Sequence, residues 1–148
     1  MVSLHRTARA SWSGDLRGGK GQMTADSGAF SNIGFSNRTR FENEPGSNPE
    51  ELIAAAHAGC FSMAFSNVLA KAGYVPDQVS TRATCTLESK PEGGFRIAKM
   101  RLETRGRVPG IDEATFQRLA QEGEKACPVS NLLRCGLEIE LDAVLESA

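Results

Sequence analysis

Two of the four cysteines in this sequence have surroundings suited to chemistry. Cys60 follows a run of alanine and glycine residues, and such a thin helix surface lets a substrate or a second backbone approach the thiol. Cys127 directly precedes Pro128, which disfavours a helical conformation at Cys127 and can open a new helical turn. A helix N-terminus stabilises a thiolate, so this spacing favours nucleophilic or redox chemistry. The alternatives are a buried core residue at Cys60 and the end of an apolar helix stripe at Cys127.

The other two cysteines, Cys85 and Cys135, take the apolar parity of predicted strands, which indicates structural positions. No C-x-x-C pair is present, so the sequence does not support a zinc site or a thioredoxin-type motif. His5 and His57 are too few for most metal sites. We therefore expect neither a metal ion nor a cofactor.

His57 and Cys60 are three residues apart on a predicted helix, so the sequence also allows a cysteine–histidine pair for hydrolysis or acyl transfer. No oxyanion-hole motif is visible, and a helix-surface or core histidine with an ordinary hydrogen bond is the favoured interpretation. A non-catalytic module that binds a lipid-like ligand or a redox partner is a further alternative. Its function would survive the replacement Cys60→Ser.

The helix that carries Cys60 has clear start and stop signals. Asn48 is suited to the N-cap, Pro49 to the first helical position, and Glu51 to the third position of a capping box. Gly73 is suited to the left-handed residue that follows a helix. The pattern predicts a helix from residue 49 to about residue 72.

The remaining pattern predicts a mixture of strands and one further helix. Asp112 caps a helix with apolar residues at helical spacing, and a parity change between Ile97 and Met100 indicates a β-bulge. Residues 28–37 are predicted to be a loop. The order β-β-β-α-β-β-α-β predicts one α+β domain over residues 1–148, whose long apolar helix must be wrapped by sheet or by another chain. The expected strands are residues 4–12, 22–25, 39–42, 81–89, 95–108 and 137–145.

Composition narrows the classes of partner. The 148 residues carry a formal net charge of −1, so no basic surface is expected for nucleic acid or an anionic membrane. The apolar run of residues 52–70 contains too many polar side chains for a confident membrane span. Residues 1–12 lack the apolar run of a signal peptide, and a chain of this length needs no disulfides. We therefore expect a cytoplasmic protein.

Two segments resemble a known family. The stretch Asn48–Ala64, which contains His-Ala-Gly-Cys-Phe, resembles the first cysteine motif of the OsmC/Ohr family, the osmotically inducible protein C and organic hydroperoxide resistance peroxidases. Cys127-Pro128-Val129-Ser130 resembles the second motif. His57 fits the OsmC branch better than the Ohr branch. The resemblance covers nearly the whole chain in the right order, with further matches at residues 12–15, 18–21, 39–42 and 108–112.

The resemblance implies a thiol-dependent peroxidase that reduces organic hydroperoxides and, less well, hydrogen peroxide in oxidative and osmotic stress. It implies an OsmC-like fold in which sheets wrap long central helices of an intertwined homodimer. It places Cys60 as the peroxidatic cysteine, Cys127 as the resolving cysteine, Arg40 as the support of the thiolate, and Glu50 as the acidic partner of Arg40. An external dithiol, such as a lipoylated protein, is the implied reductant.

Helix geometry adds a separate expectation about Glu50. Glu50 and Cys60 are ten positions apart (60 − 50) on one predicted helix. At about 1.5 Å per residue they are separated by roughly 15 Å along the helix axis. If Glu50 serves Cys60, a straight helix therefore requires that it come from a second chain.

Overall fold

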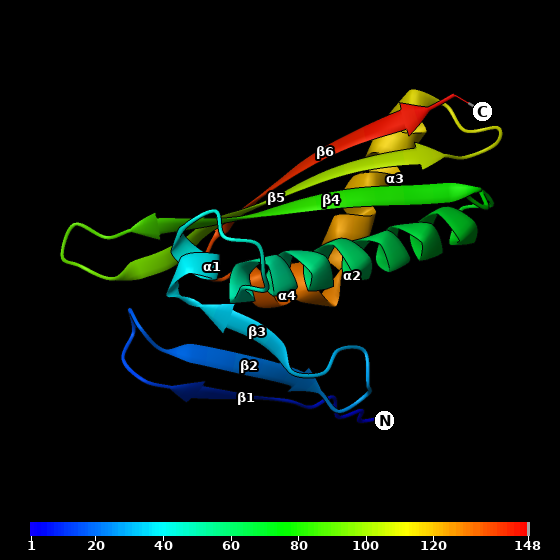
Figure 1. Cartoon of the computed structure of the whole chain (residues 1–148). Helices are drawn as coiled ribbons and strands as arrows, with labels where there is room; N and C mark the ends of the chain where they lie inside the picture. The colour runs from blue at the N-terminus through cyan, green and yellow to red at the C-terminus, as the bar shows by residue number, and fades with distance from the viewer. Residues whose placement is uncertain (148) are drawn as a thin grey trace. The chain divides into compact units, whose positions relative to one another are not determined.

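The computed structural model describes residues 1–147 and has a mixed α/β architecture, which confirms the predicted α+β class. Contacts divide the chain into an N-terminal unit, Met1–Leu52, and a C-terminal unit that begins at Ile53. Each unit has its own three-stranded sheet (Figure 1).

The N-terminal unit is an antiparallel sheet followed by a short helix. Strands β1 (Ala8–Ser13), β2 (Lys20–Ala25) and β3 (Ile33–Ser36) pair in the order β1-β2-β3. Helix α1 (Asn37–Phe41) follows β3 directly. Three predictions need correction here: β1 begins later than residue 4, the expected loop of residues 28–37 contains β3, and the expected strand of residues 39–42 is wrong.

The short helix α1 forms because Ser36 and Thr39 make a reciprocal cap. The Thr39 backbone N–H donates to Ser36 Oγ at 3.2 Å, and the Ser36 N–H donates to Thr39 Oγ1 at 2.9 Å. These two bonds satisfy backbone donors that a helix start otherwise leaves open. Local side-chain capping therefore outweighs the strand propensity of Thr39 and Phe41.

The long helix α2 (Pro49–Lys71) has the predicted boundaries. The Glu51 backbone N–H donates to Asn48 Oδ1 at 2.8 Å, which confirms the N-cap, and Gly73 has a φ of 90° at the C-terminal end. Among residues 1–147, α2 is the one helix long and apolar enough to cross a bilayer by length and composition alone. Phe61, Phe65 and Leu69 of α2 are fully buried, but only 22% of its apolar window is buried within the described chain.

The C-terminal unit has a second sheet of three longer strands. Strands β4 (Gln78–Ser89) and β5 (Phe95–Arg107) are antiparallel, and β6 (Glu138–Glu146) pairs with β5 in parallel (Figure 1). The register shifts where Thr86 and Leu87 face Lys99 and Ile97, which confirms the predicted bulge. Helices α3 (Glu113–Ala126) and α4 (Pro128–Leu133) connect β5 to β6. Asp112 caps α3 as predicted.

One face of this second sheet packs against α2 and α3. A Cβ placed on Gly123 of α3 would lie 2.9 Å from Phe65 Cα, so glycine allows α3 to approach the backbone of α2 closely. A Cβ on Gly106 of β5 would lie 2.6 Å from the Phe116 ring of α3. The Phe65 and Phe116 rings meet edge to face at 5.1 Å. This packing fixes the helix α2 against the segment that carries Cys127.

Candidate functional site

The structure brings Cys60 and Cys127 together within the C-terminal unit. Cys60 is half-buried on α2, and Cys127 is fully buried between the end of α3 and the start of α4. The Cys127 thiol is close enough to the Cys60 sulfur to raise the pKa of Cys60. Cys127 has an extended backbone and caps α4, and Pro128 occupies the first helical turn, as predicted. Two thiols in contact at this place can form a disulfide after oxidation.

The first turn of α4 supplies backbone donors to both sulfurs. The Val129 N–H lies close enough to the Cys60 sulfur to lower the pKa of its thiol. The Ser130 N–H donates to Cys127 Sγ at 3.5 Å. Donors aimed at a sulfur stabilise its anionic form, which is the nucleophile in thiol chemistry. Sequence reasoning placed a helix turn here but did not assign either backbone group to a sulfur.

The surroundings nevertheless raise the pKa of Cys60 above its ordinary value. Burial disfavours the thiolate and is the largest cause, and the neighbouring Cys127 sulfur acts in the same direction. The Val129 N–H opposes this change but does not overcome it. Burial thus favours the protonated thiol of Cys60 over its thiolate.

His57 is fully buried one helical turn before Cys60 and does not pair with it. Its Nε2 shares a hydrogen bond of 2.7 Å with Ser130 Oγ. Its Nδ1 has no hydrogen-bond partner among residues 1–147. The structure thus confirms a core histidine with an ordinary hydrogen bond, and it does not show the Cys60–His57 pair required for the hydrolytic alternative.

Burial lowers the pKa of His57 below its ordinary value of 6.5, and the nearby Glu124 carboxylate partly opposes this shift. The unfolded chain thus binds a proton at His57 at a higher pH than the folded protein does. We expect the free energy of unfolding to fall as the pH is lowered below about 6.5, and we expect this fall to be smaller in His57→Gln. Urea unfolding of both proteins between pH 5 and 8 measures it. If the free energy of unfolding changed equally with pH in wild type and His57→Gln, the expectation would be contradicted.

The N-terminal unit contains the predicted pair of Arg40 and Glu50. Arg40 Nη2 lies 2.7 Å from Glu50 Oε1, and Arg40 Nε lies 3.1 Å and 3.2 Å from the two carboxylate oxygens. The Glu50 side chain is 10% exposed and that of Arg40 is 36% exposed. A planar guanidinium held by two of its nitrogens has a fixed orientation. The pair therefore presents a preoriented cation at the end of α1.

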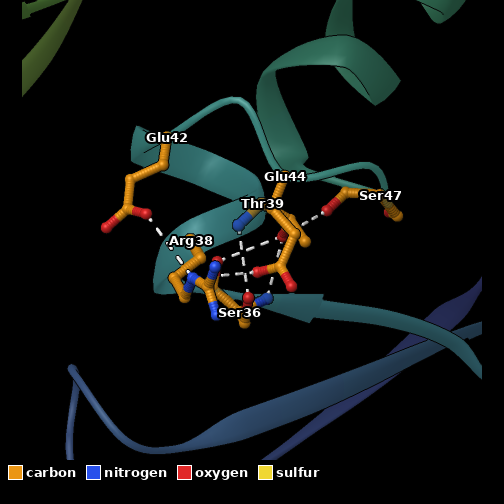
Figure 2. Close-up of polar contacts among 6 residues, drawn as sticks. All are labelled: Ser36, Arg38, Thr39, Glu42, Glu44 and Ser47. Carbon is orange, nitrogen blue, oxygen red and sulfur yellow. Dashed lines mark hydrogen bonds and ion pairs between the residues drawn. The ribbon is translucent and has the colours of Figure 1, made fainter.

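Helix α1 is held in place by side chains before and after Arg40. Thr39 Oγ1 donates to the Ser47 carbonyl at 2.8 Å, which ties α1 to the chain that leads into α2 (Figure 2). Arg38 forms ion pairs with two acidic side chains that follow it, Glu42 at 3.5 Å and Glu44 at 3.4 Å (Figure 2). These exposed ion pairs contribute little stability. The Thr39 bond and the cap make the larger contribution to the position of Arg40.

An aromatic pocket of about 240 Å³ lies beside Arg40 in the N-terminal unit. The guanidinium carbon is 5.1 Å from the centre of the Phe41 ring, a distance suited to a cation–π contact. Trp12 and Phe35 pack with their ring centres 5.4 Å apart. Besides Arg40, the lining residues are Trp12, Leu16, Phe35, Ser36, Asn37, Phe41 and Pro49.

The structure also shows where the other two cysteines and two phenylalanines of α2 lie. Cys85 is half-buried on β4, in keeping with a structural position. The strand predicted at Cys135 is wrong, because Cys135 is exposed in a turn after α4. Phe61 and Phe65 belong to the hydrophobic core. Within residues 1–147, no group of three or more acidic, histidine or cysteine side chains is arranged to hold a metal ion.

Comparison with known proteins identifies the family. The family model of OsmC-like proteins matches residues 41–142. The chain belongs to the OsmC family. It is 44% identical to peroxiredoxin OsmC of Escherichia coli K12 over 146 residues, which are 99% of this chain and 100% of that protein. It is 37% identical to an organic hydroperoxide resistance protein of Xanthomonas axonopodis pv. citri over 65% of this chain and 66% of that protein.

Solved structures confirm the OsmC-like fold. The organic hydroperoxide resistance protein OhrB of Bacillus subtilis matches with a TM-score of 0.72 at 24% identity, over 93% of this chain and 97% of that one. An organic hydroperoxide resistance protein from Elizabethkingia anophelis matches with a TM-score of 0.75 at 24% identity, over 99% and 100% of the two chains. At 24% identity, these similarities are evidence for the fold of the chain alone.

Proposed function

We propose that this protein reduces organic hydroperoxides through a Cys60 sulfenic acid and a Cys60–Cys127 disulfide. Its relatives are named as a peroxiredoxin and as hydroperoxide resistance proteins, so the protein is a peroxiredoxin-type peroxidase of peroxide defence. The observation that carries the proposed mechanism is the contact between the Cys60 and Cys127 thiols beneath the first turn of α4.

The proposed cycle has three balanced steps. The Cys60 thiolate attacks the terminal peroxide oxygen; an S–O bond forms, the O–O bond breaks, and the alkoxide leaves as the alcohol after it takes up a proton. Cys127 then attacks the Cys60 sulfur, an S–S bond forms, and the hydroxyl group leaves as water. An external dithiol exchanges with this disulfide and restores both thiols.

Within this mechanism, Arg40 supplies the positive charge that Cys60 requires and Glu50 orients Arg40. The support for this assignment is the family resemblance, the bidentate Arg40–Glu50 pair and the raised pKa of Cys60 in its own unit. A nearby guanidinium lowers the pKa of a thiol. We expect Arg40→Ala to raise the pKa of Cys60, measured from thiolate absorbance in a Cys127→Ser background. An unchanged titration curve would rule out this role.

The proposal extends to the assembly and the reductant. We propose a homodimer in which each active site uses residues of both chains, because Glu50 and Cys60 are ten positions apart on the continuous helix α2. A monomer mass in light scattering, combined with full peroxidase activity, would contradict the dimer. A lipoylated protein is the proposed dithiol, and hydrogen peroxide is the proposed slower substrate.

A thiol count tests the mechanism directly. Wild-type protein treated with one equivalent of cumene hydroperoxide should lose two thiols and release one equivalent of alcohol. The variant Cys127→Ser should lose one thiol and keep a sulfenic acid that a dimedone probe labels. Loss of two thiols in Cys127→Ser, or no loss in wild type, would exclude the proposed pair.

A further inference from the structure

Helix α2 is attached to the first turn of α4 at two points one helical turn apart. The Val129 N–H lies beside the Cys60 sulfur and favours its thiolate, and the His57 Nε2 shares a hydrogen bond of 2.7 Å with Ser130 Oγ. Because Cys127 caps α4, these contacts hold the turn that carries the second sulfur. The Ser130 N–H also donates to Cys127 Sγ, so one residue contacts both His57 and Cys127.

The His57–Ser130 contact lies in a site closed to solvent. Both residues have no exposed surface. A buried polar group that loses its partner has no water to replace it, so the contact constrains the two helices strongly. The other end of α4 is held separately, because the C-cap residue Arg134 pairs with Glu124 of α3 at 2.8 Å. Loss of the histidine contact should therefore loosen the first turn of α4 without detaching the helix.

We propose that His57, acting through Ser130, is a positioning residue for the resolving step and holds the Cys127 sulfur against Cys60. The inference rests on the proposed function, in which Cys127 attacks the Cys60 sulfenic acid. The S–S bond forms as the S–O bond breaks, and the hydroxyl group leaves with the Cys127 proton as water. No part of this role requires His57 to contact the peroxide.

The competing overoxidation of Cys60 shows why the position of Cys127 matters. A Cys60 sulfenic acid that meets a second hydroperoxide is oxidised to the sulfinic acid, while that hydroperoxide is reduced to its alcohol. Disulfide formation prevents this loss only when Cys127 attacks first. A displaced Cys127 slows the intramolecular reaction, because reacting atoms must be held near contact distance. The His57–Ser130 contact is thus expected to protect Cys60 from overoxidation.

The test compares two removals with one conservative change. His57→Leu and Ser130→Ala remove the hydrogen bond, whereas His57→Gln places an amide nitrogen near the position of Nε2 and retains it. Stopped-flow mixing with cumene hydroperoxide separates sulfenic acid formation from disulfide formation. We expect the first step to slow much less than the second, because Cys60 stays on α2 although the loosened turn carries the Val129 N–H. We expect disulfide formation to be slowed at least about tenfold in both removals, and nearly normal rates in His57→Gln.

Two further measurements give the inference definite outcomes. With excess peroxide, mass spectrometry should find the Cys60 sulfinic acid in both removal variants before it appears in wild type. The double variant His57→Leu/Ser130→Ala should be no slower than either single variant, because the two side chains act as one unit. Normal disulfide formation in folded Ser130→Ala, or equal slowing of both steps, would overturn the inference. Failure of wild type to form the disulfide would instead refute the proposed function.

Discussion

Replacement of Cys60 by serine is expected to abolish turnover of cumene hydroperoxide. A serine hydroxyl remains protonated at neutral pH, so the variant has no anionic nucleophile to attack the O–O bond. We expect the rate of peroxide consumption with dithiothreitol as reductant to fall by at least about a hundredfold, to the rate of the uncatalysed reaction. The residual peroxide is measured colorimetrically over time.

The matched control for this experiment is Cys135→Ser. Cys135 is exposed in the turn after α4, so its removal should leave peroxide consumption unchanged. Equal losses in the Cys60 and Cys135 variants would point to a different reactive thiol. Persistence of full activity in Cys60→Ser would exclude the peroxidase mechanism and favour the binding-module alternative.

Phe65→Ala is expected to reduce the free energy of unfolding by about 3–5 kcal/mol. Phe65 is fully buried, and its ring centre lies 5.7 Å from that of Phe61 and 5.1 Å from that of Phe116. Truncation removes these ring contacts and opens a cavity where α2 meets α3. Urea unfolding measured at one fixed protein concentration gives the value, because subunit association would make stability depend on concentration.

Phe95→Ala provides the comparison for this core variant. Phe95 lies at the start of β5 and is 53% exposed, so the same chemical truncation creates no internal cavity. We expect it to reduce the free energy of unfolding by less than half of the Phe65→Ala effect. A similar loss in both variants would mean that the α2–α3 contact is not a major source of stability.

Helix boundaries were the most predictable part of the fold, because their signals are local. Asn48, Pro49 and Gly73 each act within one turn of the helix end, and the structure places α2 between them. Asp112 identified the start of α3 for the same reason. A capping residue satisfies a nearby backbone donor in almost any tertiary setting, so it can be recognised without knowing the fold.

The errors arose where two local preferences compete. Residues 39–42 have strand-forming side chains, but Ser36 and Thr39 form a reciprocal cap that starts α1. A serine followed three residues later by threonine was the available signal. Cys135 has the apolar parity of a strand residue and was expected in a structural strand position, but it lies in the turn after α4. The parallel pairing of β6 with β5 depends on tertiary packing, which local sequence does not encode.

The candidate site likewise has one part that the sequence predicts and another part that depends on tertiary packing. Residue type and motif were enough to identify both cysteines, Arg40 and Glu50 as candidates. The contacts of the first turn of α4 were not predicted, because they depend on the side-by-side packing of segments distant in sequence. In the sequence Ser130 is only one member of a motif, whereas in the folded protein it reaches both His57 and Cys127.

In the proposed mechanism, the unequal exposure of the two sulfurs would set the direction of the reducing step. Within one chain Cys60 is half-buried and Cys127 is fully enclosed, so an incoming dithiol would reach a Cys60–Cys127 disulfide at the Cys60 sulfur. The mixed disulfide would then form on Cys60, with Cys127 as the leaving group. A thiolate leaves faster when it is stabilised. The Ser130 N–H that points at Cys127 would thus assist its departure in reduction.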